Sequence, residues 1–302
     1  MHTAPTDLIV IGGGVLGTFH AYHALQMGLS VRLFERDQFP QGASVRNFGQ
    51  VVPSGMDAKW QRYGRTSLRI YKSFQQSTDI SVRQLGSVYL ASDEAEMLLL
   101  EEMRAINQEA EYPSMLLTAE QCLKRYPGLR PDYVMGGLFF PEEITVDARS
   151  MIQRVLHHLS QKSGLSFHPR TLIQDMQVNG QVVTCLDHQG NAYHAGQVII
   201  CSGHEFKVLF PDLFAESDLE VSQLQMMETV VQPQVRFPGN ILTGLSIRRY
   251  ESFRACPSYE KVKAAENPDA QWKKWGVHIL FKQSPDGAVV IGDSHHYADA
   301  KD

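Results

Sequence analysis

The stretch TDLIVIGGGVLGTFHAYHALQMGLSVRLFERD, residues 6–37, decides how the N-terminal part of this chain folds. The continuous apolar run 7–11 ends at a glycine and predicts a strand buried on both faces of a parallel sheet. Apolar residues at helical spacing follow it, Gly28 is placed to end that helix, and residues 30–35 predict a second strand. The turn between the first strand and the helix carries the pattern G-x-G-x-x-G, formed by Gly12, Gly14 and Gly17. In this setting the pattern predicts a site for a dinucleotide.

The residues of the turn have separate physical roles in such a site. Gly12 permits the tight turn, Gly14 lets the backbone approach a pyrophosphate, and Gly17 lets the helix pack closely on the strand. The helix then begins at Val15 and Leu16, where free backbone N–H groups and the positive end of the helix dipole favour phosphates. We therefore expect these five residues to contact the cofactor, against the alternative of a purely structural turn.

An acidic residue closes the second strand. Glu35 lies 18 residues past Gly17, close to the ~20 expected for an acid that binds a ribose 2′-hydroxyl. A carboxylate there repels a 2′-phosphate, which disfavours NADP, and we include the adjacent Arg36 among the cofactor contacts. The fingerprint by itself does not separate NAD from FAD.

Composition places the chain among soluble globular proteins. It has 302 residues, of which 43% are hydrophobic and 20% charged, so one large or two modest domains are expected. The formal net charge of −5 argues against a dedicated nucleic-acid surface. Too few residues precede the first strand for a secretory signal, and no apolar run approaches the ~20 residues of a membrane span. We therefore expect a cytoplasmic protein that binds neither nucleic acid nor membrane.

Cysteine and histidine spacing gives no metal signature. The 4 cysteines are scattered without a CxxC pair, which favours structural thiols in a reducing compartment over disulfides or a metal site. The pairs His157-His158 and His295-His296 lack the spacing of metal ligands. The sequence therefore predicts no metal.

The remaining pattern predicts a mixed α/β fold of two interleaved domains. Amphipathic helices are expected at 59–76, at 93–110, after a capping box formed by Thr118 and Gln121, and at 148–161 behind Asp147. Two β-rich stretches follow at 165–201 and 221–293, with a hairpin turn at Pro285-Asp286-Gly287. We expect a Rossmann-like cofactor domain formed by residues 1–85 and 143–215. We expect an antiparallel-sheet substrate domain formed by residues 86–142 and 216–302.

Several further segments resemble one known family. PQGASVRNFGQVVP (40–53), together with the fingerprint, is similar to the D-amino-acid oxidase-like family of FAD-dependent amine oxidoreductases, which includes glycine, sarcosine and D-amino-acid oxidases. LTAEQCLKRYPGL, GGLFFPEEITVDARSMIQRVLHHLSQKSG and QVIICSGHEFKVLFP match family landmarks in the right order, so the resemblance covers 7–302. RNFGQVVPSG, GLSIRRYESF and IGDSHHYAD are also similar to a bacterial subgroup associated with aminophosphonate catabolism.

The resemblance implies FAD as the cofactor and adds contacts to it. Ser44 is assigned to the phosphates, and the flavin side would be lined by Arg46, Asn47, Phe48 and Gly49. The adenosine half would be contacted by Ile173, Cys201, Ser202 and Gly203. Some relatives attach the flavin to a histidine in the loop where this chain has Ala43-Ser44-Val45, so non-covalent FAD is expected here. The alternative is that 40–53 is only a solvated connection.

Amine oxidation by flavin needs few protein acids or bases, because the cofactor supplies the difficult chemistry. The expected reaction is hydride transfer from a small amine to flavin, followed by hydrolysis of the imine, with electrons passing to oxygen or a carrier. An anionic amine, an amino acid or an aminophosphonate, needs a cationic clamp, and Arg248-Arg249-Tyr250 is the candidate. On a strand the two arginines point to opposite faces, and we favour Arg248. Gln50 and His295 complete the expected substrate site.

The alternatives are two solvated arginines and a structural His295. At the level of function they are an NAD-dependent dehydrogenase and a non-catalytic or truncated flavoprotein. Neither the substrate, the electron acceptor nor the oligomeric state follows from the sequence. Members of the family usually continue past the strand matched to GDSHHY with a second glycine-rich turn and a helix, whereas this sequence ends at Ala300-Lys301-Asp302. We expect a fragment that lacks the C-terminal part of the family fold and binds FAD weakly.

Overall fold

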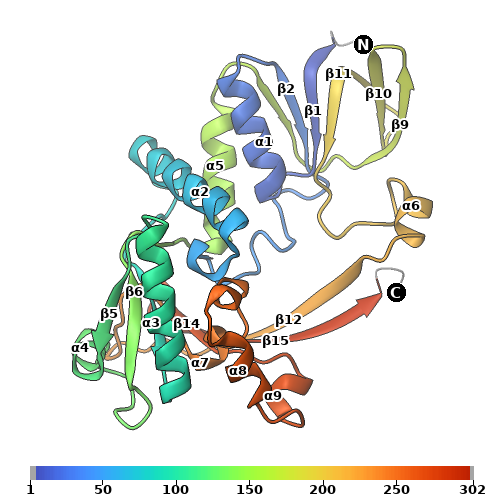
Figure 1. The fold of residues 1–302 in the computed structure, drawn as a ribbon. Coiled ribbons are helices and arrows are strands. Elements are labelled where there is room, and N and C mark those ends of the chain that lie inside the picture. The colour runs from blue at the N-terminus through green and yellow to red at the C-terminus, as the bar shows by residue number, and fades with distance from the viewer. Residues whose placement is uncertain (1–4, 300–302) are drawn as a thin grey trace. The chain divides into compact units, whose positions relative to one another are not determined.

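The computed structural model describes residues 5–299, which form two compact units (Figure 1). The first unit comprises 5–47, 148–221 and 298–299 of the described residues, and the second comprises 48–147 and 222–297. Both units are discontinuous in sequence. Residues 48–85 pack within the second unit, whereas the expected division assigned them to the cofactor domain. The chain end at 300–302 lies outside the described residues.

The first unit is built on a six-stranded sheet. Its strand order is β8 (Leu165–His168), β2 (Val31–Phe34), β1 (Thr6–Ile11), β11 (Ala192–Ile200), β10 (Val182–Asp187), β9 (Ile173–Asn179). The pairs β8–β2, β2–β1 and β1–β11 are parallel, whereas β10 is antiparallel to both β11 and β9. This mixed α/β arrangement confirms the expected fold class.

Both faces of β1 are buried, as its apolar run predicts. Val10 packs in one apolar cluster with residues of α1 (Val15–Gln26) and α5 (Ala148–Ser160), while Ile9 packs in a separate cluster on the other face. The helices α1 and α5 lie side by side against the sheet (Figure 1). Gly28 follows the C-cap Met27 with φ of +80°, the left-handed conformation that glycine tolerates, so the helix ends where the sequence predicts.

The second unit is built on a seven-stranded sheet. Its strand order is β12 (Glu220–Glu228), β15 (Val289–Asp299), β14 (Leu280–Gln283), β13 (Asn240–Leu242), β4 (Ser87–Ala91), β6 (Gly136–Phe140), β5 (Met115–Thr118). β13 and β4 are parallel, whereas β13–β14, β14–β15, β4–β6 and β5–β6 are antiparallel. The β14–β15 hairpin confirms the predicted turn. A separate two-stranded sheet joins β3 (Gln50–Val51) and β7 (Ile144–Thr145).

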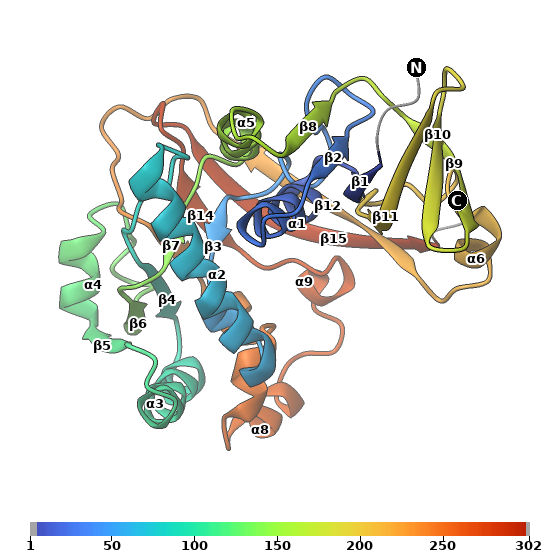
Figure 2. The ribbon, with the colours of Figure 1, turned by 90° about the horizontal axis from the view of Figure 1, so that it is seen from above.

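Helices cover both faces of this second sheet (Figure 2). Tyr89 of β4 packs with residues of α3 (Glu94–Glu109), while the adjacent Val88 packs with residues of α4 (Ala119–Arg125). Because successive side chains of a strand alternate, the two helices lie on opposite faces. The capping box that opens α4 is present, with Thr118 and Gln121 bonded reciprocally. The helix expected at 59–76 is α2 (Ala58–Ser77), beside η1 (Pro53–Gly55).

The expectation of a strand at GLSIRRY is wrong. These residues form the short helix α7 (Gly244–Ile247), with Arg248 as its C-cap, followed by the 3-10 helix η2 (Glu251–Ala255). Two more helices, α8 (Tyr259–Ala264) and α9 (Gln271–Lys274), interrupt the region expected to be β-rich, and α6 (Pro211–Ala215) precedes it. The short apolar pattern alone does not distinguish a helical turn from a strand. Within the described part of the chain, no helix is both long enough and apolar enough to cross a bilayer.

Candidate cofactor and substrate sites

The glycine turn of the first unit admits no side chain at two of its positions. Gly12 has φ of +103°, and a Cβ there would lie 2.2 Å from the carbonyl oxygen of Cys201. A Cβ on Gly17 would lie 1.8 Å from the carbonyl oxygen of Gly12. Backbone atoms cannot swing away from such contacts. Packing of β1, α1 and the end of β11 therefore requires glycine at both positions.

Gly14 differs, because one side chain and no backbone atom lies close to the position of its Cβ. A Cβ at Gly14 would meet only the side chain of Ser44, at 3.0 Å from Oγ and 4.0 Å from Cβ. Gly14 is the N-cap of α1 and supplies no capping side chain, while the Val15 N–H donates to Ser44 Oγ at 2.8 Å. The helix N-terminus and one hydroxyl thus border a gap that a Cβ would fill. This arrangement suits the phosphates of a dinucleotide.

Glu35 lies beside the same turn and is 7% exposed. Its Oε2 accepts a hydrogen bond from the Gly13 N–H at 2.9 Å, and its Oε1 accepts one from the Asp37 N–H at 3.0 Å. A carboxylate oxygen has more than one acceptor position, so both oxygens can still accept a ribose hydroxyl. Arg36 instead forms an ion pair with Glu205, with Nη1 2.8 Å from Oε2.

The segment after β11 contributes mainly backbone to this region. The Cys201 N–H donates to the Ile11 carbonyl at 2.7 Å, and the carbonyl of Cys201 faces the glycine turn. Ser202 Oγ donates to the Glu205 carbonyl at 3.3 Å, and Gly203 has φ of +67°. Ile173 is 1% exposed and its side chain belongs to the apolar core of the sheet, so a ligand could reach only its backbone.

The loop expected to line the flavin divides between the two units. In the first unit, Asn47 Nδ2 donates to the carbonyls of Ala43 and Ser44 at 2.8 and 3.1 Å, which holds the loop in a tight turn, and Arg46 is exposed. In the second unit, Phe48 is buried in the apolar core. Gly49 has φ of +67°, and a Cβ there would lie 2.1 Å from the Val146 carbonyl oxygen. Phe48 and Gly49 therefore have packing roles that the sequence alone did not indicate.

All four cysteines are free of disulfides. Burial raises the pKa of the Cys122 thiol to about 11 and that of Cys256 to about 12. These two thiols remain protonated near neutral pH and unreactive, consistent with the structural role expected.

Arg248 is held inside the second unit by carboxylates. Its Nε lies 2.7 Å from Glu96 Oε1, its Nη2 lies 2.6 Å from Asp93 Oδ2, and Glu266 Oε1 lies 3.8 Å from Nη1. The Arg248 side chain is 14% exposed, and those of Glu96 and Glu266 are 4% and 2% exposed. This network compensates the arginine charge within the protein. It gives Arg248 a structural role, whereas the sequence favoured Arg248 as the residue that binds the substrate anion.

Arg249 has weaker and neutral partners. Its Nη2 lies 3.3 Å from the Tyr297 hydroxyl, and its Nη1 lies 3.5 Å from the Gly276 carbonyl. Among the ion pairs of the described residues, none pairs Arg249 with a carboxylate. Gln50 Nε2 donates to the Phe281 carbonyl at 3.2 Å. Burial raises the pKa of the Tyr250 hydroxyl above its ordinary range, so that group remains protonated.

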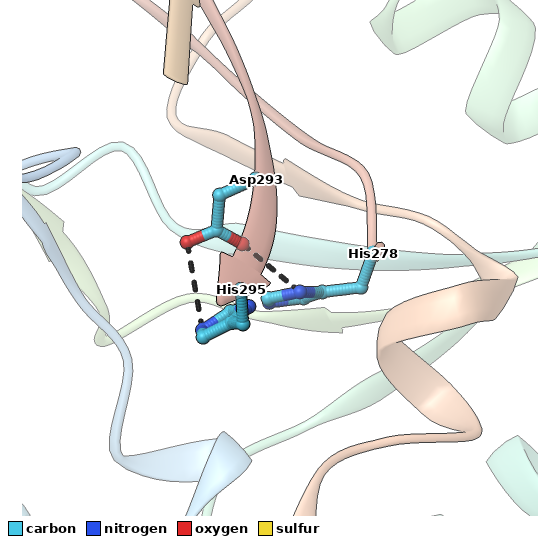
Figure 3. Close-up of side chains that lie close together, drawn as sticks. All are labelled: His278, Asp293 and His295. Atoms are coloured by element: carbon cyan, nitrogen blue, oxygen red, sulfur yellow. Dashed lines mark ion pairs between the residues drawn. The ribbon is translucent and has the colours of Figure 1, made fainter. Parts of the chain in front are cut away.

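His295 lies in a cluster with two residues that the sequence did not single out, His278 and Asp293 (Figure 3). Each carboxylate oxygen faces one imidazole: Asp293 Oδ1 is 2.9 Å from His278 Nδ1, and Oδ2 is 3.9 Å from His295 Nε2. The two rings stack with centroids 5.3 Å apart. Burial lowers the pKa of His295. The negative charge of Asp293 partly opposes this lowering, and the positive charge of Arg249 adds to it. The alternate positions of Asp293 and His295 on one strand could have indicated from the sequence that their side chains share a face. The approach of His278 had no such signal.

The fold and the glycine turn define a dinucleotide-binding protein with a second compact unit. The chain belongs to the family described as FAD dependent oxidoreductase, whose model matches residues 7–302. This confirms the family resemblance noted from the sequence, and FAD is therefore the dinucleotide rather than NAD. The comparisons do not extend to the aminophosphonate subgroup.

Individual relatives are distant. The chain is 24% identical over 236 residues to an opine oxidase subunit of Rhizobium meliloti, covering 74% of this chain and 63% of that protein. It is 23% identical over 237 residues to D-amino acid dehydrogenase of Vibrio cholerae, covering 59% of this chain and 55% of that one. Glycine oxidase from Geobacillus kaustophilus has a similar fold, with a TM-score of 0.75 at 16% identity over 98% of this chain and 73% of that chain. The matches thus span less than two thirds of these curated relatives' lengths.

Proposed function

We propose that this protein oxidises a small anionic primary or secondary amine, an amino acid or an aminophosphonate, with non-covalently bound FAD. Family membership supports the cofactor, and the observation that carries the proposal is the gap beside Gly14 at the N-terminus of α1. Relatives of this chain are named as an opine oxidase subunit, a D-amino acid dehydrogenase and a glycine oxidase. These names support an amine or amino-acid substrate.

Residues of the first unit would hold FAD through its polar parts. The N–H groups at the start of α1 and the Ser44 hydroxyl would bind the phosphates, and Glu35 would accept a ribose hydroxyl. Ala43-Ser44-Val45 offers no histidine or cysteine, which supports non-covalent binding. Bound here, FAD would supply the acceptor for a hydride equivalent from the carbon that bears the amine, and the imine product would hydrolyse in water.

Arg249 is the better candidate for binding the substrate anion. Among the described residues, its guanidinium donates hydrogen bonds to a phenol and a carbonyl and pairs with no carboxylate, so its charge can still pair with a carboxylate or phosphonate. Arg248 is already paired with Asp93 and Glu96 and lies near Glu266, so its charge is compensated before any substrate anion binds. Arg249 therefore replaces Arg248 as the proposed clamp, with Gln50, Tyr250 and His295 retained as substrate-site candidates.

A second candidate function is a flavin-binding subunit that does not itself turn over. The observation that favours it is that two relatives are named as subunits, one of an opine oxidase and the other the mitochondrial pyruvate dehydrogenase phosphatase regulatory subunit of Mus musculus. The regulatory subunit is 22% identical over 203 residues, and the match covers only 23% of its length.

Anaerobic flavin reduction tests both candidates. FAD-loaded protein is mixed with glycine, sarcosine, an N-methylated aminoethylphosphonate and an uncharged amine, and loss of flavin absorbance is followed. We expect bleaching by one of the anionic amines and little by the uncharged one. Arg249→Ala should raise KM without changing flavin content, whereas the exposed control Arg62→Ala should change neither. Absence of bleaching throughout the panel would favour the non-catalytic subunit.

A further inference from the structure

We propose that His278, Asp293 and His295 form a binding site for a divalent transition-metal ion, for which Zn²⁺ is the suited probe. The three side chains all come from the second unit and converge on one point (Figure 3). The proposal differs from the sequence prediction of no metal. It rests on the geometry of this cluster and not on the proposed function.

The backbone fixes the convergence of the three residues. Asp293 and His295 are alternate residues of β15, so their side chains leave the same face of the strand. The His278 N–H donates to the Asp293 carbonyl at 3.0 Å, which brings the third side chain alongside. The His295 N–H donates to the Trp275 carbonyl at 3.1 Å. Hydrogen bonds of the main chain therefore hold the donor set in place before any ion binds.

The distances are close to those that a metal needs. The candidate ligand atoms all lie within 4.8 Å of one another. Tetrahedral zinc with ligands at about 2.0–2.1 Å separates its ligand atoms by about 3.4 Å. The separation of 2.9 Å from Asp293 Oδ1 to His278 Nδ1 and that of 3.9 Å from Asp293 Oδ2 to His295 Nε2 lie on either side of this value. Small side-chain rotations would bring one atom of each residue to the distance that zinc needs and leave the fourth coordination position of the ion open.

Burial leaves polar atoms of this cluster without hydrogen bonds. The His278 and Asp293 side chains are only 6% and 4% exposed. His278 Nδ1 and Asp293 Oδ1 approach each other to 2.9 Å as an ion pair, yet neither atom makes a hydrogen bond. Buried polar atoms in native proteins are rarely left in this state. A cation between them would give both atoms a partner.

The outer contact of His295 is the kind that metal-binding histidines make. Its Nδ1 lies 3.2 Å from the Gly276 carbonyl, and this carbonyl can only accept a hydrogen bond. The proton is therefore placed on Nδ1, which leaves the lone pair of Nε2 directed toward Asp293. Metal-ligating histidines commonly donate their second ring N–H to a carbonyl in this way. Two imidazoles and one carboxylate form a donor set that transition metals favour.

Zinc binding to the purified, chelator-treated protein tests this proposal. After dialysis against Zn²⁺ and gel filtration, elemental analysis should give about one equivalent per chain, and Zn²⁺ should raise Tm. His278→Gln and Asp293→Asn should each lower retained zinc at least about tenfold. His296→Gln is the matched control, since His296 is exposed, lies on the opposite face of the same strand and should retain zinc like the wild type.

Circular dichroism of each zinc-free variant establishes that it folds. If one variant does not fold, the other variant and the wild-type stoichiometry decide. Wild-type protein that retains no zinc above the chelator-treated baseline would overturn the proposal. So would folded His278→Gln and Asp293→Asn proteins that bind zinc as the wild type does. None of these measurements depends on flavin reduction, so their failure is distinct from failure of the proposed function.

Discussion

Replacing Gly14 with alanine should separate cofactor binding from folding in the first unit. The backbone at Gly14 has φ of −64° and ψ of −176°, which any L-residue adopts. The new Cβ would contact only Ser44, whose hydroxyl at 3.0 Å can rotate away by giving up the hydrogen bond from the Val15 N–H. The same methyl group would enter the gap where the pyrophosphate is expected to approach the turn.

Substitutions at two glycines of the same turn should have very different effects on the free energy of unfolding and on FAD affinity. Gly14→Ala should lower the free energy of unfolding by about 1 kcal/mol, since one rotatable side chain must move and its hydrogen bond from the Val15 N–H is lost. Its affinity for FAD should fall by about 100-fold or more, equivalent to about 2.7 kcal/mol. Gly17→Ala should cost about 3 kcal/mol or more of stability, because its Cβ would lie 1.8 Å from the Gly12 carbonyl oxygen, which cannot rotate away.

Two assays on FAD-free protein separate these effects. Urea unfolding measures stability, and equilibrium dialysis measures FAD affinity. Gly196→Ala is the control, since its Cβ would lie at an ordinary 3.5 Å from the Asp7 carbonyl oxygen. This control should change the free energy of unfolding only slightly and should leave the FAD affinity unchanged. Gly14→Ala protein that binds FAD within about threefold of the wild type would refute the assignment of this gap to the pyrophosphate.

Two further predictions concern buried charge in the second unit. Arg248→Ala should lower the free energy of unfolding by about 3–5 kcal/mol, because Glu96 would stay buried without a cation beside it. A loss below about 1 kcal/mol by urea unfolding would contradict the structural role of Arg248. Burial raises the pKa of Glu143 above its ordinary 4.5, so the folded protein keeps a proton that the unfolded chain loses. Stability should therefore fall as pH rises above about 4.5, by at most about 1.4 kcal/mol per pH unit from this group. Glu143→Gln should remove that slope, and unchanged pH dependence would contradict the argument.

Local sequence patterns were sufficient to predict much of the structure of the first unit. The apolar run of β1, the glycine turn and the end of α1 at Gly28 depend on residues close in sequence, and the structure matches each of them. The capping box at Thr118 and the turn before β15 were also predictable, because turn chemistry is set by a few adjacent residues.

Long-range contacts account for what the sequence did not predict. Arg248 pairs with Glu96, 152 positions earlier in the chain, and nothing in GLSIRRY itself indicates that partner. His278 meets Asp293 only through the pairing of β14 and β15, so the approach of His278 to the cluster could not be predicted from motif spacing. Phe48 and Gly49 were expected beside the flavin, yet their burial and backbone contacts follow from tertiary packing.

The central claim is that the first unit binds FAD without a covalent bond, and reconstitution tests it most directly. Purified protein is incubated with excess FAD or NAD, freed of unbound nucleotide and examined by its absorbance spectrum. Part of the sample is then precipitated with acid. We expect a flavin spectrum, no retained NAD, and complete release of the bound FAD into the supernatant. Protein that retains no FAD, or flavin that stays with the acid-precipitated pellet, would contradict it.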